Sequence, residues 1–162
     1  MTISVGDKLP DATLIRMGES KPEQIDLTER LRGARVVIFG LPGAFTRTCS
    51  SAHVPSFIRT ADQIFAKGIK DIICIAVNDV HVMKLWGAET GGTSAGISFL
   101  ADADNAFTTA IGMQFDAPVV GFFARSKRYS MLVDDGTVKI LNTEVSRGVC
   151  ELSAGEVLLA QM

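Results

Sequence analysis

The sequence predicts an α/β protein built on a central mixed β-sheet that is flanked by helices. Three observations predict this class: continuous apolar runs typical of buried strands, helical stretches between them, and a turn signal late in the chain. The chain has 162 residues, of which 47% are hydrophobic and 21% charged, which suits one globular domain over residues 1–162.

Several segments are expected to form the sheet. Residues 12–17 (ATLIRM) are a modest strand, and residues 97–100 (ISFL) are a short one. Residues 35–40 (RVVIFG) and 71–77 (DIICIAV) are continuous apolar runs, which is typical of central strands covered on both faces. The region that starts with residues 119–123 and runs on to residue 144 contains two strand-like segments. They lie on either side of Asp134-Asp135-Gly136, a sequence that favours a hairpin turn.

Helices are expected between and after these strands. Residues 48–67 form one that Gly68 ends, and Pro55 should kink it or delay its regular start. Residues 80–89 and 105–111 form two more. In the last helix, residues 153–161, Ser153 and Glu156 have the spacing of a capping box.

Charge and cysteine content narrow the function classes. The net charge is −2 and no basic patch stands out, so a nucleic-acid partner is not expected. No secretory signal and no run of about 20 apolar residues is seen, so we expect a cytoplasmic protein without a membrane span. The three cysteines, Cys49, Cys74 and Cys150, form neither a disulfide framework nor a Cys-x-x-Cys motif.

The stretch LPGAFTRTC places Cys49 where a site is expected. It follows the strand at residues 35–40 and opens a helix, and ligand sites in such sheets lie at the carboxyl ends of strands. Unpaired N–H groups and the helix dipole favour a thiolate there. The alternative from placement alone is a small buried thiol that only packs.

The loop resembles a known family. Pro42-x-x-x-Thr46-x-x-Cys49, within PGAFTRTCSSAHVPSF, matches the peroxiredoxin signature, and the downstream RYSMLVDDG is similar too. The chain resembles the type-5-like peroxiredoxins, also called type II or atypical two-cysteine peroxiredoxins. Arg47 stands where the family usually has proline, and Ser56 where it usually has glycine.

The resemblance implies a thioredoxin-like fold and a thiol peroxidase. Cys49 would reduce hydrogen peroxide and organic hydroperoxides and become a sulfenic acid. Thr46 and the backbone N–H groups of Thr48 and Cys49 would contact the peroxide, while Pro42 would screen the sulfur from water. No metal or prosthetic cofactor is implied.

Two further residues are expected beside the sulfur. Arg128 matches the family arginine that supports both thiolate and peroxide, with Arg125 and Lys127 as competitors for that role. His53 lies four residues after Cys49 and shares its helix face, so it is expected as a hydrogen-bond partner behind the sulfur. The alternatives for His53 are packing under the pocket or half of a metal pair.

Three routes of reduction stay open. Cys74 or Cys150 could resolve the sulfenic acid within the chain, since related proteins carry a second cysteine near one position or the other. Alternatively an external thiol attacks Cys49 directly, with glutathione, glutaredoxin or thioredoxin as donor. The resemblance favours glutathione or glutaredoxin.

The family also implies a homodimer, with Phe45 of the loop near the contact. Two alternatives to an enzyme stay open: a thiol-based peroxide sensor that relays oxidation to a partner, and a non-catalytic binding module. A phosphatase loop needs an arginine six residues after its cysteine, and here that residue is Pro55.

Overall fold

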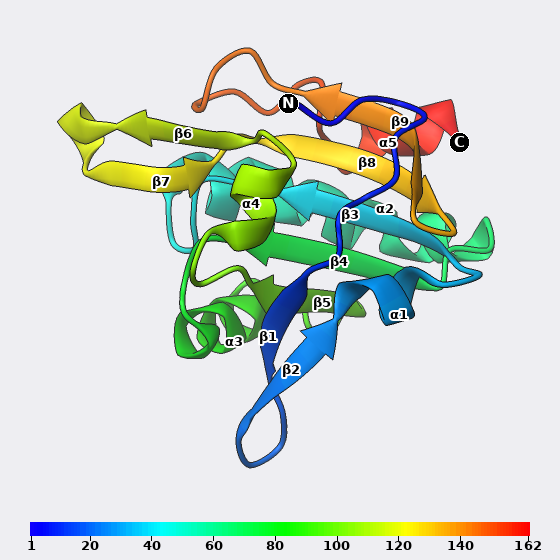
Figure 1. Cartoon of the computed structure of the whole chain (residues 1–162), viewed down its shortest axis with the longest axis horizontal. Helices are drawn as coiled ribbons and strands as arrows, with labels where there is room; N and C mark the ends of the chain where they lie inside the picture. The colour runs from blue at the N-terminus through cyan, green and yellow to red at the C-terminus, as the bar shows by residue number, and fades with distance from the viewer.

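A seven-stranded mixed sheet forms the centre of the molecule, and it confirms the predicted α/β class (Figure 1). The computed structural model describes all of residues 1–162. The strand order is β2-β1-β5-β4-β3-β8-β9, with β3, β4 and β5 parallel and the other neighbours antiparallel. The bounds are β1 Thr13–Met17, β2 Pro22–Asp26, β3 Arg35–Gly40, β4 Asp71–Ala76, β5 Ile97–Ala101, β8 Tyr129–Asp134 and β9 Thr137–Thr143.

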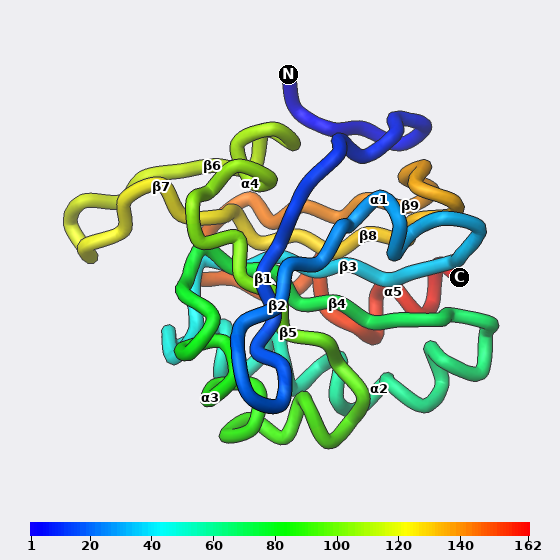
Figure 2. Tube along the Cα trace, turned by 60° about the horizontal axis from the view of Figure 1, so that its bottom comes forward, coloured from blue at the N-terminus to red at the C-terminus, as the bar shows by residue number.

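Helices cover both faces of this sheet (Figure 2). Three of them share one apolar cluster on one face: α2 Val54–Ala66, α3 Val80–Glu89 and α5 Gly155–Gln161. The shorter α1 Leu27–Leu31 and α4 Ala106–Ala110 belong to the cluster on the other face. In strand β3, Val37 and Phe39 belong to the first cluster, and Val36 and Ile38 belong to the second. Both faces of the strand are therefore buried, which explains its continuous apolar sequence.

The predicted hairpin is confirmed, but the segment before it was predicted wrongly. Asp134 pairs with Thr137 across a turn in which Asp135 and Gly136 both have positive φ, as a two-residue hairpin requires. The segment at residues 119–123 is not continuous with β8. Residues Pro118–Val120 are a 3-10 turn, and β7 Phe122–Ser126 pairs only with β6 Gln114–Ala117. These two strands form a ribbon that projects from the sheet (Figure 1).

The short elements β2 and α1 were not predicted. Strand β2 has the sequence PEQID, in which alternate residues are exposed, and it lies at the edge of the sheet. Its charged residues and initial proline are compatible with an edge strand but do not distinguish it from a loop. Helix α1 is only five residues long, too short to show a helical period.

The prediction of a capping box at the last helix is wrong. The Ser153 hydroxyl donates instead to buried Glu144, and Glu156 bonds Arg59 of α2. The first N–H of α5, from Gly155, donates to the Ser56 hydroxyl at 2.9 Å. A residue of α2 therefore caps α5, and a side chain at Gly155 would lie only 2.6 Å from the Ser56 carbonyl oxygen.

Candidate active site

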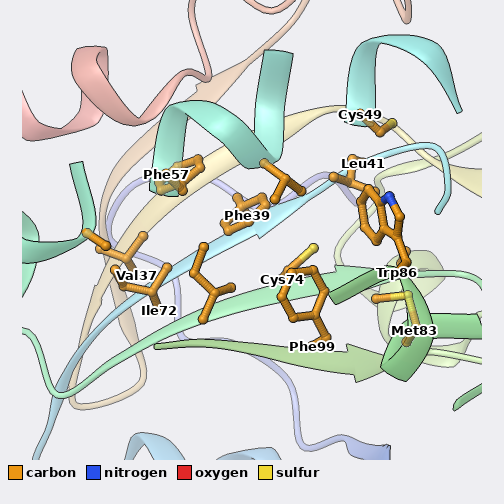
Figure 3. Close-up of a cluster of buried hydrophobic side chains, with 14 of the residues drawn as sticks. Val37, Phe39, Leu41, Cys49, Phe57, Ile72, Cys74, Met83, Trp86 and Phe99 are labelled. Atoms are coloured by element: carbon orange, nitrogen blue, oxygen red, sulfur yellow. The ribbon is translucent and has the colours of Figure 1, made fainter. Parts of the chain in front are cut away.

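Cys49 begins an irregular turn between β3 and α2. Residues Cys49–His53 form a π-helical turn, and the regular α-helix starts at Val54, so Pro55 delays its start as predicted. Cys49 has no exposed surface. It lies on the turn beyond Leu41 and Trp86, at one end of the apolar cluster (Figure 3).

Arg128 brings a positive charge to this buried sulfur. It directly precedes β8, is only 2% exposed, and its Nη2 donates to the Cys49 Sγ at 3.3 Å. Nη2 also donates to the Arg147 carbonyl oxygen at 3.1 Å. No carboxylate forms an ion pair with this guanidinium. Cys49 is therefore the one group in contact with Arg128 that can become an anion.

His53 holds the other side of the same guanidinium. Its Nε2 lies 3.1 Å from the Ser153 carbonyl oxygen, and its Nδ1 lies 3.1 Å from the Arg128 Nη1. A carbonyl oxygen only accepts, so Nε2 carries the proton and Nδ1 accepts from Arg128. Burial, and then the Arg128 charge, lower the pKa of His53 well below 6.5, although the Ser153 bond opposes this. His53 is therefore neutral and orients Arg128.

The loop before Cys49 supplies further polar groups. The Thr46 hydroxyl donates to the Gly43 carbonyl oxygen at 2.7 Å, which leaves its oxygen free to accept. The N–H groups of Thr48 and Cys49 have no hydrogen-bond partner within the chain, as expected in the first turn of a helix. Pro42 is buried beside them and has no N–H.

A cleft of about 600 Å³ opens above these groups. Arg128, Pro42 and Thr46 line it together with two apolar side chains, Val120 and Phe122. The cleft gives a small molecule a path to the residues that surround the buried sulfur, so the arrangement can support chemistry at Cys49.

The competing cations lie elsewhere. Arg125 reaches only the Pro42 carbonyl oxygen, at 3.4 Å, and stands 5.7 Å from the centre of the Phe122 ring. Lys127 is exposed and forms no hydrogen bond through its side chain. Among the three predicted candidates, only Arg128 contacts the sulfur.

The other two cysteines differ from Cys49 in their surroundings. Cys74 is fully buried on β4, where it is paired in register with Phe39 and Phe99 (Figure 3). Burial raises the pKa of its thiol well above the usual value, to which the nearby Cys49 adds. Cys150 is partly exposed in the segment before α5, and burial raises the pKa of its thiol while Arg128 opposes this.

Sequence reasoning missed the segment between β9 and α5, which closes over the site. Glu144 is buried, and its Oε1 accepts from the N–H groups of Glu151 and Ser153. The segment thereby presents the carbonyl oxygens of Ser153 and Arg147 to His53 and Arg128. Backbone carbonyls carry no sequence signal, and Glu144 is a single buried residue between partly buried and exposed neighbours, so no sequence pattern pointed to them. No cluster of three metal-ligating side chains occurs.

Comparisons with known proteins show the family to which the chain belongs. The family model described as Redoxin matches residues 4–158. Rice (Oryza sativa subsp. japonica) Peroxiredoxin-2C is 41% identical over 98% of this chain and 98% of its own length. Rice chloroplastic Peroxiredoxin-2E-2 is 42% identical over 98% of this chain and 72% of its own length. Reduced Prx3 of Vibrio vulnificus in complex with H2O2 is similar in structure, with a TM-score of 0.91, 41% identity and 99% of each chain covered.

The fold and the site thus define a thiol-dependent redoxin with a thioredoxin-like fold. The chain belongs to the redoxin family, and within it to the type II peroxiredoxins, which are thiol peroxidases. Such enzymes take their electrons from an external thiol and need no prosthetic group. No helix is long and apolar enough to cross a membrane. The cytoplasmic location stays a prediction, since several relatives are chloroplastic or mitochondrial.

The lowered pKa of His53 predicts how stability depends on pH. Below about pH 6.5 the unfolded chain binds a proton at this histidine before the folded protein does. The free energy of unfolding should therefore decrease as the pH is lowered, by up to about 1.4 kcal/mol per pH unit from this group. Urea titrations between pH 7.5 and 5.5, followed by Trp86 fluorescence, measure that slope.

In His53→Asn the slope should be smaller, because the titrating group is gone. His81→Asn is the matched control, since His81 is exposed at the start of α3, and it should keep the parent slope. Equal slopes for the parent and His53→Asn would contradict the prediction.

Proposed function

We propose that Cys49 is the residue that attacks the peroxide and that Arg128, Thr46 and Pro42 form its reaction pocket. The observation that carries this proposal is the 3.3 Å hydrogen bond from Arg128 to the Cys49 sulfur. An unpaired buried guanidinium is costly, and a Cys49 thiolate is the anion that balances it. The thiolate is also the nucleophilic form of the residue.

The reaction follows from the groups around the sulfur. The thiolate attacks one peroxide oxygen in line with the O–O bond, so an S–O bond forms as the O–O bond breaks. The sulfur is oxidised by two electrons to the sulfenic acid, and the departing oxygen leaves as hydroxide or alkoxide and takes a proton from water. Arg128 and the free N–H groups of Thr48 and Cys49 stabilise that negative charge, and Thr46 accepts from the peroxide O–H.

An external thiol then reduces the sulfenic acid. Cys74 is packed in the core, and its raised pKa keeps it as a thiol, so it is a poor nucleophile where it stands. Cys150 is more accessible, but burial raises the pKa of its thiol too. We therefore propose glutathione or glutaredoxin as the donor. Its thiolate attacks the Cys49 sulfur, an S–S bond forms as the S–O bond breaks, and the hydroxide that leaves takes a proton from the solvent; a second thiol then reduces the mixed disulfide.

The protein is proposed to act as a homodimer. Phe45 is 54% exposed, and its positive φ of 62° is uncommon for a residue other than glycine. Two apolar side chains of the neighbouring ribbon region, Val119 and Phe123, are 88% and 64% exposed. An apolar surface of this kind is typical of a contact between subunits.

The first test concerns the chemical step. Cys49→Ser should abolish hydroperoxide consumption, and Arg128→Met should lower its second-order rate constant by about 100-fold or more, since a charge-stabilising donor is lost. Stopped-flow oxidation with hydrogen peroxide measures both. Arg125→Met is the control and should lose far less, because Arg125 does not contact the sulfur. Parent-like rates in Cys49→Ser would end the proposal.

The second test concerns reduction. Cys74→Ser and Cys150→Ser should each retain turnover with glutathione and glutaredoxin, because neither cysteine is needed by an external donor. Steady-state peroxidase assays with each donor, thioredoxin included, provide the measurement. Loss of turnover in one variant would assign that cysteine as the resolving residue. Oxidation without turnover in the parent would support the sensor alternative.

The third test concerns assembly. The parent should sediment as a dimer at micromolar concentration, and Phe45→Asp should shift it toward monomer, because a charge would be buried at the contact. Val5→Asp is the control, since Val5 is comparably exposed, in the N-terminal segment beside β9, where Gly6 donates to Val138. A monomeric parent would refute the dimer.

A further inference from the structure

The cleft over Arg128 is far larger than hydrogen peroxide requires. Its volume is about 600 Å³, whereas a water molecule occupies only about 30 Å³ in the liquid. Clefts of about 300–1,000 Å³ hold organic molecules in proteins. The space therefore accommodates a hydroperoxide with a sizeable organic group, if the walls suit that group.

One wall of the cleft is apolar. Val120 and Phe122 line it, from the 3-10 turn and from β7. Arg125 stands against the Phe122 ring, with 5.7 Å between its guanidinium carbon and the ring centre. This cation–π contact positions the ring. An alkyl chain that lay against Val120 and Phe122 would be removed from water.

The remaining charged groups of the cleft all have one sign. Arg47, Arg128 and Arg147 line it, and no acidic side chain does, although the chain as a whole has a net charge of −2. Arg47 and Arg147 are exposed and form no ion pair. The arginines that do form ion pairs lie outside this cleft: Arg16, Arg30, Arg32 and Arg59.

The arginines are also ordered by depth. Arg128 is buried at the floor and contacts the sulfur, whereas Arg47 and Arg147 are exposed at the mouth. Two hydrogen bonds connect the segment that carries Arg147 to the groups around the sulfur. The Arg147 carbonyl oxygen accepts from Arg128, and the Gly148 carbonyl oxygen accepts from the Thr48 hydroxyl at 3.2 Å. A ligand with its O–O group at the floor would therefore place its far end near the mouth arginines.

We propose that Arg47 and Arg147 form a carboxylate subsite, so that the enzyme selects aliphatic hydroperoxides that carry a carboxylate, such as hydroperoxides of fatty acids. The inference rests on the proposed function, because the O–O group must reach Cys49. The carboxylate itself is unchanged: the S–O bond forms, the O–O bond breaks, and the alkoxide takes a proton from water. Guanidinium groups suit this role because they bind carboxylates through paired donors.

The test compares the hydroperoxide of linoleic acid with that of its methyl ester, which lacks the charge. Oxidation of the reduced enzyme is followed by Trp86 fluorescence, since Trp86 Nε1 donates to Ser50, the residue after Cys49. The parent should react with the acid about five- to ten-fold faster than with the ester at low salt, and the ratio should fall as salt screens the charges. In the double variant Arg47→Ala/Arg147→Ala, the ratio of the rate with the acid to the rate with the ester should approach one.

Three controls separate the outcomes. Lys139→Ala removes an exposed positive charge on β9, outside the cleft, and should keep the parent ratio. Arg47→Lys should keep part of it, because a point charge survives. Hydrogen peroxide, assayed in parallel, reports whether the parent carries out the Cys49 chemistry at all, so failure of the proposed function is recognised separately.

The carboxylate could instead belong to the reductant. The reductive half-reaction is therefore measured on the oxidised enzyme, with glutathione and with its diethyl ester, in which both carboxylates have lost their charge. A ratio near one for the parent in the oxidative half-reaction would overturn the proposal. So would an arginine effect confined to reduction by glutathione, because the subsite would then serve the thiol and not the hydroperoxide.

Discussion

The contact between the Arg128 guanidinium and the Cys49 sulfur is the interaction on which the rest of the site depends. Arg128 is the only buried lysine or arginine of the chain, and it has no carboxylate partner. A charge in that position is tolerated when its neighbours offer acceptors and a counter-anion. Here the acceptors are His53 Nδ1, the Arg147 carbonyl oxygen and the Cys49 sulfur.

A chain of hydrogen bonds carries this constraint outward. Glu144 holds Ser153, the Ser153 carbonyl oxygen fixes His53, and His53 accepts from Arg128. Because the Ser153 carbonyl oxygen can only accept and Arg128 can only donate, His53 is neutral with its proton on Nε2. Removing one member would leave a buried polar group unsatisfied, and effects within such a network are not additive. The segment after β9 thus belongs to the site as much as the cysteine loop does.

The cysteines show how environment decides chemistry. Cys49 and Cys74 belong to the same apolar cluster and both have no exposed surface. Cys74 is surrounded by strand neighbours such as Phe39 and Phe99, whereas Cys49 lies at the end of the cluster against a guanidinium and beneath an open cleft. Burial, to which the nearby Cys49 adds, raises the pKa of the Cys74 thiol, whereas the Cys49 sulfur has the Arg128 guanidinium in contact with it.

The amino-acid sequence alone predicted the class of fold, the central strands, the hairpin at Asp135-Gly136 and the family, because periodicity, turn residues and the motif around Cys49 are local signals. Short elements without a period, such as β2, α1 and the β6–β7 ribbon, were left to the tertiary structure. So were the cap of α5 by Ser56 and the network from Glu144 to Arg128, since their partners are far apart in sequence. Choosing Arg128 over Arg125 and Lys127 on geometry also needed the fold. Neighbouring cations are alike in sequence, and only the pairing of β8 with β3, the strand that leads into the cysteine loop, brings one of them to the sulfur.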